Sequence, residues 1–334
     1  MDGLTTEDKD ELCQRLAIAL KGKDVSPDAE TKRKAAQDAY EQARTAVKKE
    51  KEKIKKEKLR KKEDRDKAYQ ERVLPLDNDA TIRRNEWLAA LKEAVPRLEL
   101  ALGARIDCTA REYREHVEEF IQSHDRASRE AVQYLAAFGS DACTEDGKGA
   151  PEERAIEATP FCFIRGSGNQ NFLDTVRQLQ GKVTSDGVRQ TLFEPWNYRD
   201  KGLSMRWDPI EDKRYALMDT KPADDGTRTV WMANLLAYRA LALFPCAPTH
   251  QGLGTTAWAK VDGEEEFRWP LWEFAAAPEL VGTMLQLREL GQDQLDRAAL
   301  SRRGIAAVFR ARRIRFPPRG ASYKLNFSPA RQLL

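Results

Sequence analysis

Apolar residues recur at helical spacing through most of the N-terminal half of the chain. The spacing predicts helices over residues 5–20, 79–103 and 109–138. Thr109 and Glu112 have the spacing of a capping box at the start of the third helix, and Gly139 ends it. The polar stretch 140–158 is predicted to be a surface loop.

The segment from residue 28 to residue 72 contains few apolar positions. Ala, Glu, Lys, Arg and Gln dominate it, Gly and Pro are missing, and this composition predicts one long helix followed by a linker at 73–79. Between Arg44 and Lys67 thirteen basic residues stand against six acidic ones, which makes the helix positive. Three interpretations stay open: a solvated helix or partly disordered linker, a helix that zips to a partner helix through a narrow seam, and an arm that lies along phosphates.

Shorter apolar runs separated by turn residues follow Thr159. They predict strands at 161–164, in two short pieces within 202–217, and at 305–316, and helices at 172–179, 230–244, 278–290 and 292–300. Asp262-Gly263 between two such runs predicts a hairpin. The expected fold is therefore α+β: a helical N-terminal half with a long basic helix, followed by a mixed domain with a small sheet. The expected domains are a helical, Lys-rich extended arm (1–74), a helical subdomain (75–140) and an α+β domain with a basic C-terminal strand (159–334).

Length and composition limit the class of protein. The 334 residues carry a formal net charge of +3, are 41% hydrophobic and suffice for about two domains. The five cysteines are scattered, and no Cys/His spacing resembles a metal site, so we expect no metal or other cofactor. An acidic, polar N-terminus without a signal-peptide pattern, and the absence of a long apolar run, predict a cytoplasmic protein with no membrane partner.

A Gly/Asn loop, Arg165–Asn171, follows a predicted strand and precedes a predicted helix. Backbone N–H groups in such a loop can face an anion, and Asn169 and Asn171 are candidates to contact a nucleic-acid backbone. The loop lacks the Lys-Ser/Thr of a Walker motif and the third Gly of a dinucleotide fingerprint. The alternative is a tight turn with Asn caps.

Three carboxylates, Asp208, Glu211 and Asp212, lie close together in a Pro-containing segment. Such a cluster can hold Mg²⁺ for a nuclease or another phosphoryl-transfer enzyme. The alternative is a salt-bridged turn, because Lys and Arg alternate with these acids, with Trp207 packing inward. His250 has no nucleophile tied to it by sequence, which argues against a catalytic role.

The C-terminal stretch is basic and contains no acid after Asp296. Alternation within the predicted strand places several of Arg310, Arg312, Arg313 and Arg315 on one face, with aromatic residues interleaved. Arg side chains suit phosphates and aromatic rings suit bases, so the stretch predicts nucleic-acid contact. The alternative is that these arginines pair with acidic residues of the same protein.

One ordered set of motifs carries a family resemblance: Gly-Asn-Gln-Asn-Phe172, Phe193–Trp196, Met205–Pro209, Asp212–Ala216, Ala233-Asn234 and Phe244–Pro248. The set resembles proteins encoded in type I-G (formerly I-U) CRISPR–Cas loci, which include large-subunit-like proteins and a family described as an extension of the Cas helicase–nuclease. The resemblance covers roughly residues 159–334, excludes the Lys-rich segment, and implies family members with more sequence ahead of Met1. It also implies a component of an RNA-guided surveillance complex, with other Cas subunits as partners and no catalytic residues.

We therefore expect a non-enzymatic nucleic-acid-binding subunit of a type I CRISPR–Cas defence complex, with DNA or guide RNA as its ligand. The expected contacts are Arg310, Arg312, Arg313, Arg315, Lys55, Lys58 and Lys62, with Asn169 and Asn171 on the backbone.

Overall fold

The computed structural model describes residues 5–57, 61–147, 149–164, 170–211, 228–316 and 324–334. They form two compact units: one is residues 23–103, and the other joins the chain up to Gly22 with residues 104–334. This division differs from the three expected segments, because the first helix belongs with the C-terminal part. Helix α1 (Thr6–Lys21) packs on α8 (Ser185–Phe193), and the Gln180 amide donates to the carbonyl of Leu20.

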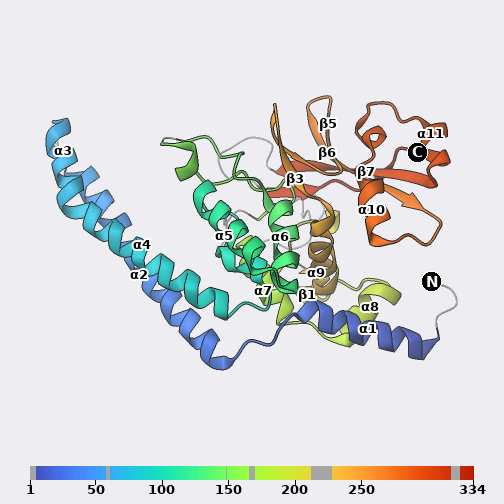
Figure 1. The fold of residues 1–334 in the computed structure, drawn as a ribbon, viewed down its shortest axis with the longest axis horizontal. Helices are drawn as coiled ribbons and strands as arrows, with labels where there is room; N and C mark the ends of the chain where they lie inside the picture. Colours follow the sequence, from blue (N-terminus) through green and yellow to red (C-terminus); the bar gives the residue numbers. More distant parts are fainter. Residues whose placement is uncertain (1–4, 58–60, 148, 165–169, 212–227, 317–323) are drawn as a thin grey trace, which may run out of the picture. The chain divides into compact units, whose positions relative to one another are not determined.

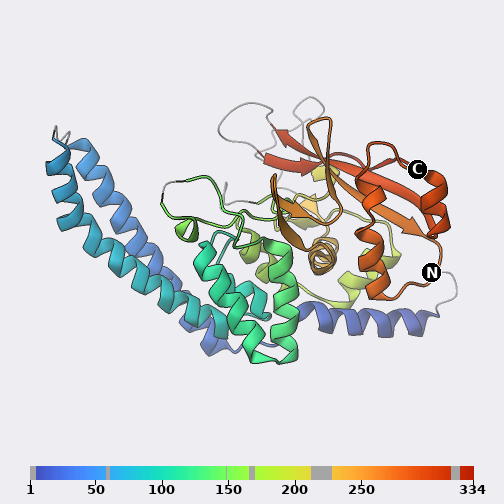
Figure 2. The same cartoon turned by 45° about the horizontal axis from the view of Figure 1, so that its top comes forward.

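The unit of residues 23–103 is a helical hairpin. Its elements are α2 (Pro27–Lys56), α3 (Lys62–Ala68), the π-helical turn η1 (Tyr69–Val73), α4 (Leu74–Glu93) and the 3₁₀ turn η2 (Leu98–Leu102). Helices α2 and α4 run side by side in both views (Figure 1) (Figure 2). The expected single helix thus ends at Lys56. The expected linker at 73–79 is instead helical, because Pro75 lies in the first turn of α4, where a missing N–H costs nothing.

The narrow apolar seam of α2 is covered by α4 of the same chain. Tyr40 stacks on Trp87, with ring centroids 5.5 Å apart, and Val47 and Val73 are buried. Arg72 bonds Glu57 and Glu50, which ties the returning chain to the end of α2. The few apolar residues of α2 are therefore enough for an intramolecular hairpin.

The helices of the larger unit surround an aromatic core. They include α5 (Ala110–Ser123), α6 (Arg126–Phe138), α7 (Phe172–Gln180) and α9 (Trp231–Ala240). The capping box of Thr109 and Glu112 is confirmed, but the expected helix over 109–138 is divided at His124, whose φ of 55° is left-handed. Tyr134 and Tyr238 stack at 5.4 Å in the core formed by these helices.

An antiparallel sheet forms the rest of the larger unit. Its strand order is β5 (Trp258–Val261), β6 (Glu264–Trp272), β7 (Ile305–Phe316) and β8 (Lys324–Phe327), and β9 (Arg331–Gln332) also pairs with β7. Two further two-stranded sheets pair β1 (Asp200–Lys201) with β2 (Arg228–Thr229) and β3 (Cys246–Thr249) with β4 (Gly252–Thr255). The Asp262-Gly263 hairpin is confirmed: both residues have positive φ, as this tight turn requires.

The expected strand at 161–164 is not found, and the two short strands expected within 202–217 are tested only as far as Glu211. Phe161–Ile164 is buried as expected, but its backbone forms local turns, with Cys162 N–H donating to Thr159 O, and it pairs with no strand among the described residues. The segment after Gly202 contains the 3₁₀ turn η5 (Pro209–Glu211), and residues 212–217 lie outside the described ranges. A short apolar run alone does not separate a strand from an irregular buried segment.

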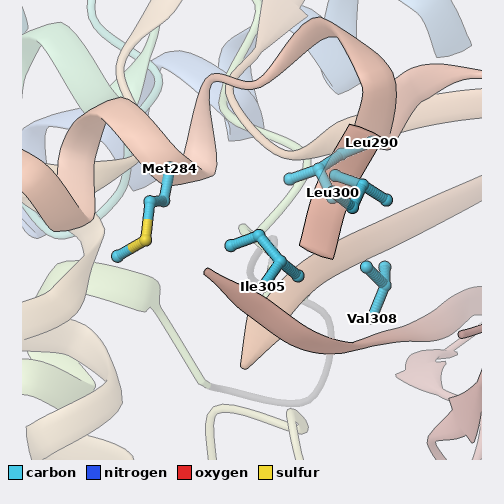
Figure 3. Packing of buried hydrophobic residues seen from close by; sticks show 5 residues of the cluster. All are labelled: Met284, Leu290, Leu300, Ile305 and Val308. Atoms are coloured by element: carbon cyan, nitrogen blue, oxygen red, sulfur yellow. The ribbon is translucent and has the colours of Figure 1, made fainter. Parts of the chain in front are cut away.

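The two faces of the sheet pack against different side chains. Phe267, Trp269 and Phe309 stack on one face. On the other, the segments α10 (Pro278–Leu285), η8 (Arg288–Gly291) and α11 (Arg297–Arg302) cover the start of β7. Figure 3 shows the resulting cluster of Met284, Leu290, Leu300, Ile305 and Val308. The fold is α+β, as expected. Within the described ranges, no helix has both the length and the apolar character needed to cross a membrane.

Candidate nucleic-acid interface

The strand arginines lie in the middle of the sheet, where β7 pairs with β6. The register sets Arg312 opposite Glu266 and Arg310 opposite Arg268. Because side chains alternate along a strand, Arg310 and Arg312 share the face of Glu266, and Arg313 and Arg315 lie on the other face. The four predicted contacts are therefore divided between the two sides of the sheet.

Glu266 is fully buried and accepts hydrogen bonds from three arginines. Arg268 donates from Nη2 at 2.9 Å and Nε at 3.1 Å, Arg312 donates from Nε at 2.9 Å, and Arg310 pairs with the same carboxylate. Arg268 is itself 3% exposed, and its Nη1 donates to the carbonyls of Leu290 (3.0 Å) and Gln292 (2.6 Å). The cluster thereby joins β6, β7 and η8.

The pKa of the Glu266 carboxyl group is lowered. Burial alone would raise this pKa, but the hydrogen bonds from Arg312 and Arg268 and the charges of Arg268 and Arg310 outweigh burial. The carboxylate therefore stays ionised at neutral pH and neutralises part of the arginine charge. On the other face, Arg313 pairs with Glu265, and its guanidinium lies 5.7 Å from the Trp258 ring centroid. Arg315 is exposed.

These ion pairs correspond to the alternative of arginines paired with acids of the same protein. Arg310, Arg312 and Arg313 each have a carboxylate partner, so an incoming phosphate would have to displace or share that partner. Arg313 also lines a cleft of about 890 Å³ with His250 and Lys260. The hydroxyl of Thr249, next to His250, donates a hydrogen bond to Gly252 O and stabilises the β3–β4 turn.

Of the two loop asparagines, Asn171 is among the described residues. Asn171 accepts a hydrogen bond from Arg105 Nε at 2.6 Å, and its amide lies 3.4 Å from Asp174. Its side chain thus connects the start of α7 to the segment before α5. Asn169 and the rest of the Gly/Asn loop up to it lie outside the described residues.

The candidate carboxylate cluster is described only at Asp208. One of its oxygens accepts from the Tyr198 hydroxyl at 2.8 Å and the other from Ile210 N–H at 3.0 Å, so Asp208 shapes the turn. Trp207 packs inward and donates to Phe161 O at 2.8 Å. Nothing is described of Asp212 or of the Glu211 side chain. Among the residues that are described, no group of three or more His, Cys, Asp or Glu could hold a metal ion.

The lysines of α2 are placed differently from the strand arginines. Four exposed residues share one face of the helix: Lys48, Lys49, Lys55 and Lys56. At 100° per residue they span about 120° of arc, whose centre lies about 140° from that of the seam of Tyr40, Val47 and Ile54. The exposed Glu52 lies near the middle of the same arc. None of the four forms an ion pair with another described residue. We call these four residues the lysine face.

Only one member of the lysine face, Lys55, is among the residues selected from sequence. Lys62 is exposed in the first turn of α3, beside Glu63 and Asp64, and Lys58 lies outside the described residues. The signal for Lys48, Lys49 and Lys56 was the seven-residue repeat, which returns a residue to the same side of a helix. Lys51 and Lys53, by contrast, pair with Asp77 and Glu50.

Comparison with known protein families, curated proteins and solved structures finds no match for this chain.

Proposed function

We propose that this protein is a non-enzymatic nucleic-acid-binding subunit, and that the lysine face of α2 is its main phosphate contact. The observation that carries the proposal is the placement of four exposed lysines on one side of a helix, without carboxylate partners among the described residues. Such a face attracts a polyanion through charge and counterion release, without any need for a shaped pocket.

Local sequence favours this placement over a solvated, self-neutralised helix. The neighbours of a helical residue lie three and four residues away. Glu52 is the one acid at those distances, and it lies at them from all four lysines, so the face keeps a surplus of three positive charges. Lys48 and Lys55 are one heptad apart, about 10.5 Å along the axis, as are Lys49 and Lys56. Two parallel rows of ammonium groups can therefore follow a phosphate backbone.

Binding across a salt series tests the proposal. The wild-type protein should bind labelled duplex and single-stranded DNA and RNA with an affinity that falls steeply as salt rises. Lys48→Gln with Lys55→Gln should weaken binding uniformly across sequences and lower the salt slope by about two, one for each lost phosphate contact.

The matched control is Lys51→Gln with Lys53→Gln. It removes the same charge from the same helix, at lysines that already have carboxylate partners. Its salt slope should stay near that of the wild type. Equal weakening by both double variants would assign binding to net charge alone, and absence of binding at low salt would refute the proposal.

We propose further that the complex is a type I CRISPR–Cas complex, in which guide RNA or target DNA is the ligand. The motif set between Gly168 and Pro248 supports this assignment. Affinity purification from cells that express a complete type I-G locus should recover guide RNA and Cas subunits with the wild-type chain. Recovery of the chain without either would contradict the assignment and leave the lysine face to be judged by the salt series.

A further inference from the structure

A pocket of about 370 Å³ opens between α8 and α9, away from the arginine cluster of the sheet. Its volume lies within the range of small-molecule sites, roughly 300–1,000 Å³. The side chains that matter for its chemistry are Lys182, Gln190, Trp196, Asn197, Arg199 and Trp231. Indole rings can stack on a base, and cations can bind a phosphate.

Both indole rings are held in place by their own N–H groups. Trp196 Nε1 donates to Thr191 O at 3.0 Å, although the side chain is 47% exposed. Trp231 Nε1 donates to Gly202 O at 3.2 Å. Because the polar atoms are used internally, each ring can offer only its face or edge. A fixed, exposed aromatic face is what an unpaired base stacks on.

The two rings have different surroundings. Lys182 Nζ lies 5.5 Å from the Trp231 ring centroid, so an ammonium group already covers a face of that ring. The Trp196 ring meets Tyr198 edge to face, at 6.3 Å and 70°. Trp196 is therefore the stacking surface, and Trp231 positions the lysine.

The acidic side chains of the pocket already accept hydrogen bonds, whereas its basic side chains form no ion pair with a described residue. Asp200 accepts from Trp231 N–H at 2.8 Å, and Asp186 accepts from the Gln190 amide at 2.7 Å. Lys182 and Arg199 are exposed and form no ion pair with any described residue. With two acids against two bases the lining has no net charge, which suits one phosphate attached to an aromatic group better than a long polyanion.

We infer that this pocket holds a single unpaired nucleotide, whose base stacks on Trp196 and whose phosphate lies between Lys182 and Arg199. The inference rests on the proposed function and names its substrate class, a single-stranded segment. A base within a duplex cannot enter, because its faces are already stacked and its edge is paired.

The test compares a dT tetranucleotide with an abasic tetranucleotide of the same charge, by titration calorimetry with the full chain. Trp196→Leu should weaken the dT tetranucleotide roughly 5- to 150-fold, the range of one lost base stack, and leave the abasic strand unchanged. Trp196→Phe keeps an aromatic face and should restore most of the affinity. Lys182→Gln should weaken both strands alike.

Several results would overturn the inference: an unchanged dT affinity in Trp196→Leu, equal loss for the abasic strand, or binding of a proline-rich peptide in place of the oligonucleotide. The last would make the pocket a protein-docking site. Lys48→Gln with Lys55→Gln should weaken duplex binding while leaving the difference in affinity between the dT and abasic tetranucleotides unchanged. Failure of the pocket and failure of the lysine face therefore give different results.

Discussion

Replacement of Glu266 with glutamine removes the one carboxylate that three arginines share. Arg268, Arg310 and Arg312 all donate to it, and Arg268 is buried with it. The amide keeps the shape but loses the charge, and its NH₂ group cannot accept from a guanidinium. Arg268 would then be a buried cation that has lost its anionic partner and keeps two backbone carbonyls and, at most, the neutral amide oxygen.

The expected cost follows from the burial of the pair. Breaking a buried ion pair by removal of one partner costs about 3–5 kcal/mol, because a charge is left without compensation. Glu265→Gln is the matched control one residue away. The Glu265 side chain is 43% exposed and pairs with Arg313, so its loss should cost about 0–1 kcal/mol.

Urea denaturation followed by tryptophan fluorescence provides the measurement. Six of the seven tryptophans lie in the unit that contains the sheet, so the signal reports mainly on that unit. A midpoint shift corresponding to less than about 1 kcal/mol for Glu266→Gln, or no larger than that for Glu265→Gln, would refute the structural role of the cluster.

The pH dependence supplies a second check. Burial raises the pKa of Glu266, but the hydrogen bonds and charges of the surrounding guanidiniums together outweigh it, so this pKa is lowered in the folded protein. Its ionised form therefore contributes stability in full above the unfolded pKa of about 4.3, and the contribution is lost as pH falls through the folded pKa. The stability difference between wild type and Glu266→Gln should shrink below about pH 4, and a constant difference would contradict the assignment.

Three further substitutions test local features by the same urea assay. Gly304→Ala should cost about 1–2 kcal/mol, because φ is +78° and a Cβ would lie 2.5 Å from Phe274 Cε1; an unchanged midpoint would exclude this backbone strain. Asn234→Leu should cost about 1–3 kcal/mol, because the buried Met205 N–H loses its acceptor at 2.9 Å; a neutral effect would mean that the N–H finds another partner. His124→Gly should add about 1 kcal/mol, because φ is 55° at the C-cap of α5; a loss would show that the imidazole makes a compensating contact.

Local signals predicted the elements that depend on local interactions. The capping box at Thr109, the Asp262-Gly263 turn and the strand over 305–316 all act within a few residues of the chain, and all are present. The break of the long basic helix after Lys56 was missed, because helix propensity alone continues through that point. The position at which α4 returns along α2 depends on Arg72 and on the Tyr40–Trp87 stack, which are long-range contacts.

Long-range contacts also determine the candidate site, and they could not be predicted from local sequence. The arginines of β7 were identified correctly as a dense positive stretch, but their partners Glu265 and Glu266 are more than forty residues away. Only the strand register brings Glu266 opposite Arg312, and a shift by one residue would place it on the other face of the sheet. The pocket at Trp196 likewise joins segments whose proximity no local pattern indicates.

A surplus of positive residues in the sequence stays unpaired in the fold or becomes neutralised, depending on whether a strand or a helix carries it. On a strand, the nearest neighbours of a charged residue are cross-strand residues, so an apparent surplus can be neutralised by a distant segment. On an exposed helix face, the nearest neighbours are three and four residues away and can be read directly from the sequence. For the lysine face those neighbours include one acid, Glu52, against four lysines. This difference is the physical reason to propose a nucleic-acid contact on α2 rather than on β7.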